Sequence, residues 1–111
     1  MEAMTLREVC NAVGVTRRAV QCYEKEELVS STGKNKYGYL LYDEEAVKRI
    51  QEIRMYQEFG FALKDIRLLL ECSQKEYVEM MEKKLAEMRK QLLRLEANIV
   101  KVEELIAEKL K

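Results

Sequence analysis

The sequence predicts a mainly α-helical protein in two parts, a winged helix-turn-helix domain followed by one long helix. Three observations support this prediction. Two short amphipathic segments meet at a glycine, aromatic residues then alternate along a short stretch, and apolar residues finally repeat in heptads. We expect the first domain to cover residues 1–72 and the long helix to cover residues 73–111.

The helix-turn-helix is expected over about residues 5–25. Thr5 and Glu8 fit a capping box, in which the two side chains bond the first free amides of a helix. Gly14 stops that helix, and Thr16 is a good cap for the second one. The residues that recur at helical intervals, and are therefore expected to face the core, are Leu6, Val9, Cys10, Val13, Ala19, Val20 and Tyr23.

A wing and two further helices are expected next. Residues 30–36 are rich in turn formers, and the aromatic alternation of residues 37–42 predicts a short hairpin, so we place the wing at about 30–42. Acidic residues 43–45 suit the positive end of a third helix, and Gly60 ends it. A fourth helix completes residues 43–71. The residues of both helices that are expected to face inward are Ala46, Val47, Ile50, Ile53, Tyr56, Ile66, Leu69 and Leu70.

The last part of the chain carries a heptad pattern over about residues 75–110, with no glycine or proline to interrupt it. A helix of this length extends for roughly 50 Å. The chain offers no second long helix to meet this apolar seam, so we expect pairing between two chains. The seam begins at Val78 and Met81, and its expected dimer contacts are Leu85, Met88, Leu92, Leu95, Ile99, Val102 and Ile106.

Composition excludes several classes of function. The formal net charge is zero, so any DNA binding must come from local clusters of cations. Histidine is absent and the three cysteines form no CxxC pair, which leaves no set of ligands for a metal, and no motif calls for another cofactor. With no acid–base constellation we expect no enzyme and no catalytic residue. No apolar run approaches the ~20 residues of a membrane span, and the cysteine usage favours a cytoplasmic protein.

The order of these elements resembles the MerR family of bacterial transcription regulators over nearly the whole chain. The resemblance lies in "VGVTRRAVQCYEKEEL", in "YGYLLYDEEAVKRIQEIRMYQEFGFALKDIRLLL" and in the final heptads. It implies a homodimer joined by an antiparallel coiled coil, with each second helix in the major groove of double-stranded DNA. It also implies that the dimer bends and untwists promoter DNA, so that RNA polymerase contacts both promoter elements. We expect a short member without an effector-binding domain.

Candidate DNA contacts lie in the second helix and the wing. An arginine pair is most often a solvated helix face, but Arg17 and Arg18 lie between a predicted turn and a predicted wing, and guanidinium fits both phosphate and the guanine edge. Among the wing tyrosines we favour Tyr42 as a core residue and Tyr39 as a contact to the DNA backbone. The full predicted set is Thr16, Arg17, Arg18, Tyr23, Lys34, Lys36, Tyr37 and Tyr39.

The chain departs from the family pattern at Gln21 and Leu40, where members usually carry arginines that contact phosphate. Together with the neutral charge, these departures support a second interpretation. In it, the chain is a coiled-coil interaction module that forms heterodimers with related regulators and binds DNA weakly. Cys72 lies near the place of a metal ligand in metal-sensing members, and its role stays open between an inert thiol and a sensor.

Overall fold

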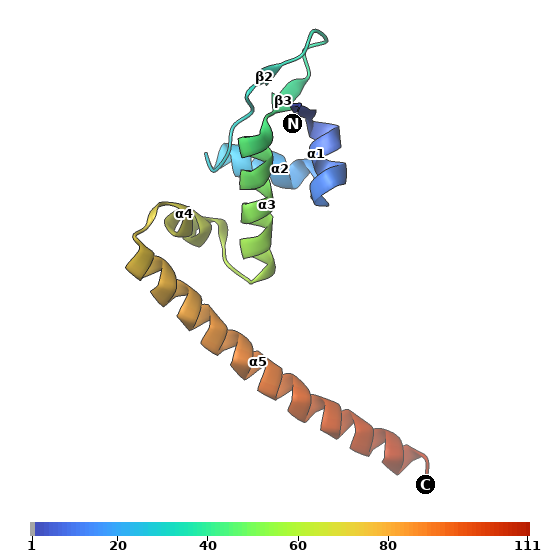
Figure 1. Ribbon diagram of the computed structural model, residues 1–111. Helices are drawn as coiled ribbons and strands as arrows, with labels where there is room; N and C mark the ends of the chain where they lie inside the picture. The colour runs from blue at the N-terminus through green and yellow to red at the C-terminus, as the bar shows by residue number, and fades with distance from the viewer. Residues whose placement is uncertain (1) are drawn as a thin grey trace. The chain divides into compact units, whose positions relative to one another are not determined.

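The computed structural model describes residues 2–111, so Met1, which opens the predicted first domain, lies outside the described residues. The prediction of a mainly α-helical winged helix-turn-helix with a long final helix is confirmed (Figure 1). The chain forms two compact units, one that runs to Glu71 and one that comprises Cys72–Lys111. In chain order the elements are β1 (Met4–Thr5), α1 (Leu6–Val13), α2 (Arg17–Lys25), β2 (Gly33–Lys34), β3 (Leu40–Tyr42), α3 (Glu44–Glu58), α4 (Leu63–Glu71) and α5 (Gln74–Lys109).

The helix-turn-helix forms as its capping residues predict. The Thr5 hydroxyl accepts from the Glu8 amide at 3.3 Å, and the Glu8 carboxylate accepts from the Thr5 amide at 3.0 Å, which completes the capping box. These hydrogen bonds hold the pKa of Glu8 below its usual value, so the cap remains charged at neutral pH. Gly14 ends α1 with φ +79°, a conformation that suits glycine, and the Thr16 hydroxyl caps α2 by accepting from the Ala19 amide at 3.0 Å.

The wing is the β2–β3 hairpin, and it belongs to a three-stranded antiparallel sheet in the order β1-β3-β2. The hairpin reaches beyond the helices of its unit (Figure 1). Strand β1, which pairs Met4 with Tyr42, has no signal in the sequence because it is only two residues long. Tyr42 is fully buried, as its assignment to the core predicted. The sheet therefore fixes the base of the wing to the start of α1.

The core of the first unit collects the inward faces of α1 to α4. The buried residues of α3 are the five that its periodicity predicts, and Asp43 caps the helix by accepting from the Ala46 amide at 2.9 Å. In α4, Ile66 and Leu69 are buried, whereas Leu70 is only partly covered. Four residues of the first two helices are likewise only partly covered, less than their assignment to the core predicted, and they are Leu6, Cys10, Val13 and Ala19.

Helices α2 and α3 end in the same hydrogen-bonded motif. After α3, the amide of Gly60 donates to Gln57 and that of Phe61 donates to Tyr56, and the Phe61 and Tyr56 rings pack edge to face. After α2, the amide of Glu27 donates to the carbonyl of residue 24 at 3.0 Å, and that of Leu28 donates to the carbonyl of residue 23 at 2.9 Å. The left-handed residue is Gly60 in the first case but Glu27, at φ +59°, in the second.

We expect Glu27→Gly to stabilise the protein. A left-handed conformation costs an ordinary L-residue about 1–2 kcal/mol, and glycine removes this cost while adding some entropy to the unfolded chain. The free energy of unfolding should therefore rise by about 0.5–1 kcal/mol in urea denaturation at a fixed protein concentration. Lys25→Gly, inside α2, is the control and should lower the stability by a similar amount. A Glu27→Gly variant that is less stable than the wild type would contradict the assignment of the motif.

The second unit is the 36-residue helix α5, which Ser73 caps by accepting from the Glu76 amide at 3.2 Å. It has no buried residue although it carries the apolar seam. Leu92 and Leu95, for example, are 55% and 58% exposed. The helix is confirmed, and its pairing as a coiled coil stays a prediction. Across residues 2–111, no helix combines the length and the apolar character that crossing a membrane requires.

Candidate nucleic-acid interface

The residues of helix α2 divide between a buried face, which packs on the rest of the unit, and an exposed face. Val20 and Tyr23 are buried on the inward side, since helical geometry places positions three apart on one face. The outward residues are exposed, and they are Arg17, Arg18, Gln21, Cys22 and Lys25. The predicted arginine pair therefore lies at the start of the exposed face, directly after the cap residue Thr16.

The cations of α2 are available to a ligand. Within residues 2–111, neither the Arg17 nor the Arg18 side chain makes a hydrogen bond or an ion pair. By contrast, Arg54 and Arg67 of the same unit are both engaged by carbonyl and carboxylate oxygens. Unpaired guanidinium groups on an exposed helix suit planar, bidentate recognition of phosphate or of a guanine edge.

The tip of the wing is ordered by Asn35. Its side-chain oxygen accepts from the amides of Tyr37 and Tyr39 at 2.9 and 3.0 Å, and its backbone amide donates to the Tyr39 carbonyl at 2.9 Å. Gly38 closes the turn with φ +83°. These bonds leave the side chains of Tyr37 and Tyr39 exposed, by 71% and 64%. The Lys36 ammonium lies 5.1 Å from the centroid of the Tyr37 ring, within the range of a cation–π contact.

A groove of about 570 Å³ lies where α1, α2 and the wing meet. It brings together two predicted site residues, Arg17 and Tyr39, and it also contains Gln21 and Leu40, the two departures from the family pattern. Sequence reasoning missed Arg7, which lines the same groove, because nothing in the local pattern of α1 distinguishes it from a solvated arginine. The complete lining is Thr5, Leu6, Arg7, Arg17, Gln21, Gly38, Tyr39 and Leu40.

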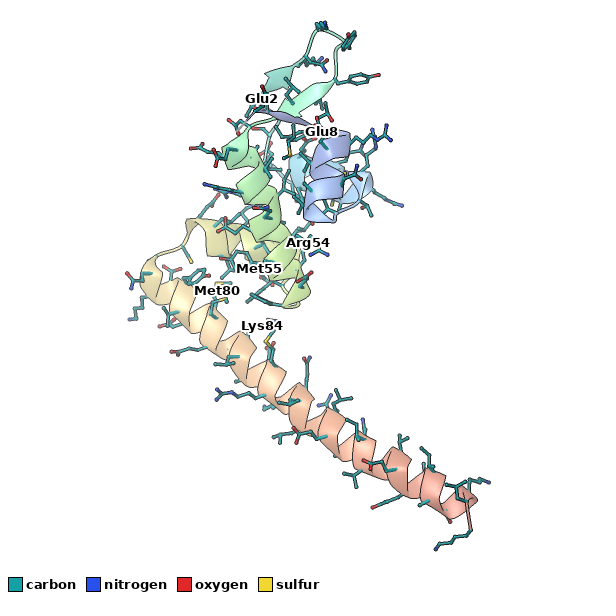
Figure 2. The ribbon with its side chains drawn as sticks, turned by 45° about the vertical axis from the view of Figure 1, so that its right-hand side comes forward. Glu2, Glu8, Arg54, Met55, Met80 and Lys84 are labelled. Carbon is teal, nitrogen blue, oxygen red and sulfur yellow. The ribbon has the colours of Figure 1, made fainter. Side chains whose placement is uncertain are left out.

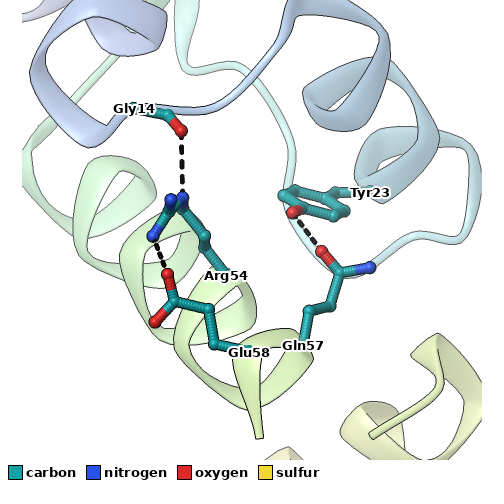
Figure 3. Close-up of polar contacts among 5 residues, drawn as sticks. All are labelled: Gly14, Tyr23, Arg54, Gln57 and Glu58. Carbon is teal, nitrogen blue, oxygen red and sulfur yellow. Dashed lines mark hydrogen bonds and ion pairs between the residues drawn. The ribbon is translucent and has the colours of Figure 1, made fainter. Parts of the chain in front are cut away.

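The turn before α2 and the middle of α2 are both fastened to α3 (Figure 3). The Tyr23 hydroxyl donates to the Gln57 side-chain oxygen at 2.5 Å. The Arg54 side chain points toward the end of α1 (Figure 2), where its Nε donates to the Gly14 carbonyl at 3.0 Å, and it also pairs with Glu58. Burial raises the pKa of Tyr23, and the positive charge of Arg54 opposes part of that rise.

Two further contacts fix the C-terminal part of α2. The hydroxyl of the buried Tyr42 donates to the Glu24 carboxylate at 2.5 Å, which joins the wing to the helix. Burial and this carboxylate together raise the pKa of Tyr42 well above its usual value, so the phenol keeps its proton. Arg67 of α4 approaches the Glu26 carboxylate at 3.8 Å. The helix and the wing are therefore held in one orientation relative to each other.

Tyr23→Phe separates a packing role for this residue from a polar one. The ring should keep its place, and the lost hydrogen bond to Gln57 should lower the free energy of unfolding by about 0.5–1.5 kcal/mol. Urea denaturation measures the change. Tyr37→Phe, on the exposed wing tip, is the matched control and should leave stability unchanged. Equal stability of the Tyr23→Phe variant and the wild type would show that the hydroxyl bond contributes nothing to folding.

The remaining predicted residues lie apart from the groove. Lys34 and Lys36 are exposed on the wing, and the seam residues lie on α5, in the other unit. Among the residues that the structure describes, no group of three His, Cys, Asp or Glu side chains could hold a metal ion. The geometry around α2 is that of an exposed, cationic surface.

Comparison with known families gives two matches that together cover most of the chain. The model described as MerR HTH family regulatory protein matches residues 4–72, and the model described as MerR, DNA binding matches residues 47–108. The nodulation protein NolA of Bradyrhizobium elkanii is 38% identical over 64 residues, which are 58% of this chain and 29% of that protein. The mercuric resistance operon regulatory protein of Bacillus cereus is 32% identical over 63 residues, 57% of this chain and 48% of that protein.

The chain therefore spans about a quarter to a half of the length of the curated relatives it matches. Two solved structures share its fold. HiNmlR, a MerR family regulator that lacks the sensor domain and is bound to promoter DNA, aligns with a TM-score of 0.75 at 19% identity, over 88% of this chain and 79% of that one. The N-terminus of Mta, the Bacillus subtilis multidrug transporter activator, aligns with a TM-score of 0.69 at 22% identity, over 93% of this chain and 97% of that one.

Proposed function

We infer a homodimeric promoter-binding function from one premise, which is that the chain belongs to the MerR family of DNA-binding transcription regulators. In this proposal each subunit places α2 in the major groove and lays its wing along the backbone, and the dimer distorts the DNA between its two recognition helices. RNA polymerase then contacts both promoter elements on the distorted DNA. Because the promoter DNA of a bacterial cell lies in the cytoplasm, we propose that the protein acts there.

One observation supports the proposal that the protein binds DNA. Two arginines on the exposed face of α2, beside an exposed wing, have no side-chain partner within the protein. We assign Arg18 to a base edge, because it lies within the first turn of the helix that enters the groove. The residues assigned to the sugar–phosphate backbone are Thr16, Arg17, Lys34, Lys36, Tyr37 and Tyr39. Tyr23, which is buried and donates its hydroxyl to Gln57, is assigned to packing instead. Backbone contacts of this kind position the protein, and base contacts specify the sequence.

The exposed seam of α5 supports the dimer. Its large apolar residues recur at alternating steps of three and four, and those from Leu85 to Ile106 that are exposed have between 46% and 58% of their surface open to water. A stripe of this length on a monomer is unfavourable, and a second copy of the same helix covers it completely. We propose the antiparallel arrangement, which brings two recognition helices to one DNA site.

The distortion step needs a source of free energy. Smooth bending of a site of 20–30 base pairs costs on the order of 1–6 kcal/mol, which the protein–DNA contacts must offset. Cations on both α2 and the wing supply contacts on two sides of the backbone, and the bonds that fix α2 to the wing and to α3 keep those contacts at a set distance. The DNA, rather than the protein, then adapts its shape.

A second candidate function rests on the groove beside α2. Gln21 and Leu40 add no positive charge at the two positions where members of the family usually carry arginine, and the whole chain is neutral, which favours a heterodimerising module with feeble DNA affinity. Selection of bound fragments from random duplex DNA, at low and at moderate salt, separates the two. A regulator enriches a pair of related half-sites, whose spacing reports the distance between recognition helices. Weak binding without enrichment at either salt concentration would favour the interaction module instead.

A further inference from the structure

Arg7 is an exposed cation of α1 that the proposed interface has not yet used. It lies in the first turn of the helix and lines the groove between α1, α2 and the wing. Over residues 2–111 its guanidinium group makes no hydrogen bond and no ion pair. Arg17 lines the same groove from α2 and is equally unpaired. The helices α1 and α2 therefore each contribute one unpaired guanidinium group to the same groove.

The lining of this groove favours an anion. It contains two arginines and no carboxylate, and the polar side chains of Gln21 and Tyr39, which also line it, can each donate a hydrogen bond. The carboxylate that follows Arg7 in the chain, Glu8, does not line the groove and is engaged by the amide and hydroxyl of Thr5. Two cations that share a hollow without an acid repel each other until an anion lies between them.

We propose that Arg7 and Arg17 together bind one phosphate of the DNA backbone in this groove, with the Tyr39 hydroxyl as a further donor. The proposal rests on the DNA-binding function proposed above. Leu6 and Leu40, which also line the groove, offer an apolar surface to the neighbouring deoxyribose. Arg7 thus supplies from α1 a cation that neither Gln21 of α2 nor Leu40 of the wing supplies.

Because Gln21 lines the same groove as Arg7, the two positions should be exchangeable. An arginine introduced by Gln21→Arg projects into the groove that Arg7 occupies and can neutralise the same phosphate. Folding should be little affected, since both side chains are exposed. This exchange distinguishes a contact in the groove from a general effect of net charge.

The test is a salt titration of binding to a pool of random-sequence duplex DNA, measured by fluorescence anisotropy on the full chain. Each phosphate contact contributes about 0.9 to the slope of log affinity against log salt. Arg17 still contacts the shared phosphate after this change, so Arg7→Ala should weaken binding at low salt and flatten the slope by at most about 0.9 per subunit, or about 1.8 per dimer. The double variant Arg7→Ala with Gln21→Arg should regain the lost slope. Arg49→Ala, which removes the same charge from α3 outside the groove, is the control and should leave the slope unchanged.

The results separate this inference from the function on which it rests. If Arg7→Ala keeps both the wild-type affinity at low salt and the wild-type slope, while the wild type binds DNA with clear salt dependence, the inference is overturned and the proposed function is left intact. Equal flattening by Arg49→Ala, or an exchange variant that regains nothing, also overturns it, because the phosphate then lies outside the groove. No binding by the wild type at low salt removes the proposed function, and the inference falls with it.

Discussion

The variant with Leu92→Asp and Leu95→Asp is expected to be a monomer at micromolar concentration and to lose tight DNA binding. Both leucines lie on the exposed seam of α5. In an antiparallel pair they meet apolar residues of the second chain, so the dimer would bury four carboxylates without partners. Each buried ion costs several kcal/mol, which weakens dimerisation by on the order of a thousandfold or more. Sedimentation or light scattering measures the mass, and anisotropy measures the DNA affinity.

Lys90→Asp is the matched control for this variant. It changes the net charge by the same amount as the two leucine substitutions, but the heptad pattern places residue 90 opposite the seam. It should remain dimeric and bind DNA with only a modest loss. A wild-type protein whose mass equals a single chain at micromolar concentration would refute the dimer directly. A dimer that survives both leucine substitutions would place the interface elsewhere.

Arg18→Ala is expected to weaken specific binding more than Lys36→Ala does. A bidentate contact to a base edge discriminates by about 1–3 kcal/mol, so affinity for the selected site should fall roughly 5- to 150-fold for each subunit that makes it. The loss should be much smaller on unrelated DNA, because the base contact exists only at the selected site. Competition titrations on both duplexes measure the ratio.

Lys36→Ala serves as the comparison, because this lysine lies on the wing beside the Tyr37 ring and is assigned to phosphate. Its loss should weaken binding to all sequences alike and flatten the salt dependence by about 0.9 per subunit. If Arg18→Ala left both affinity and site preference unchanged, α2 could not be the helix that reads the bases. The outward face of that helix would then need another role.

Local signals allowed most of the fold to be predicted from the sequence. The capping box at Thr5, the stop at Gly14 and the cap at Thr16 involve residues no more than three positions apart, and all three are confirmed. The inward face of α3 followed from helical periodicity alone. Strand β1 was not predicted, because two residues are too few to show an alternating pattern and their partners in β3 lie far along the chain. The burial of Phe61 was not predicted for a similar reason, since a single apolar residue after a glycine forms no periodic pattern.

The site was less accessible to sequence reasoning than the fold. The contacts that hold α2 join residues 34 and 18 positions apart, Tyr23 to Gln57 and Tyr42 to Glu24, and neither pair has a signature in the sequence. Arg7 became a candidate only when tertiary structure placed it beside Arg17 and the wing. The assignments of individual DNA contacts and of the seam remain predictions, because they depend on partners outside a single chain.

The separation of the two faces of α2 has a consequence for engineering. Val20 and Tyr23 hold the helix in the unit, while the outward side chains contribute nothing to its packing. The outward positions can therefore be varied as a library of helix-forming residues, without glycine or proline, provided that Thr16 and the buried pair are retained. If α2 reads the bases as proposed, selection from such a library should yield variants that recognise new operators. In the proposed function, point substitutions on this face would then change the DNA target of the protein while its fold stays the same.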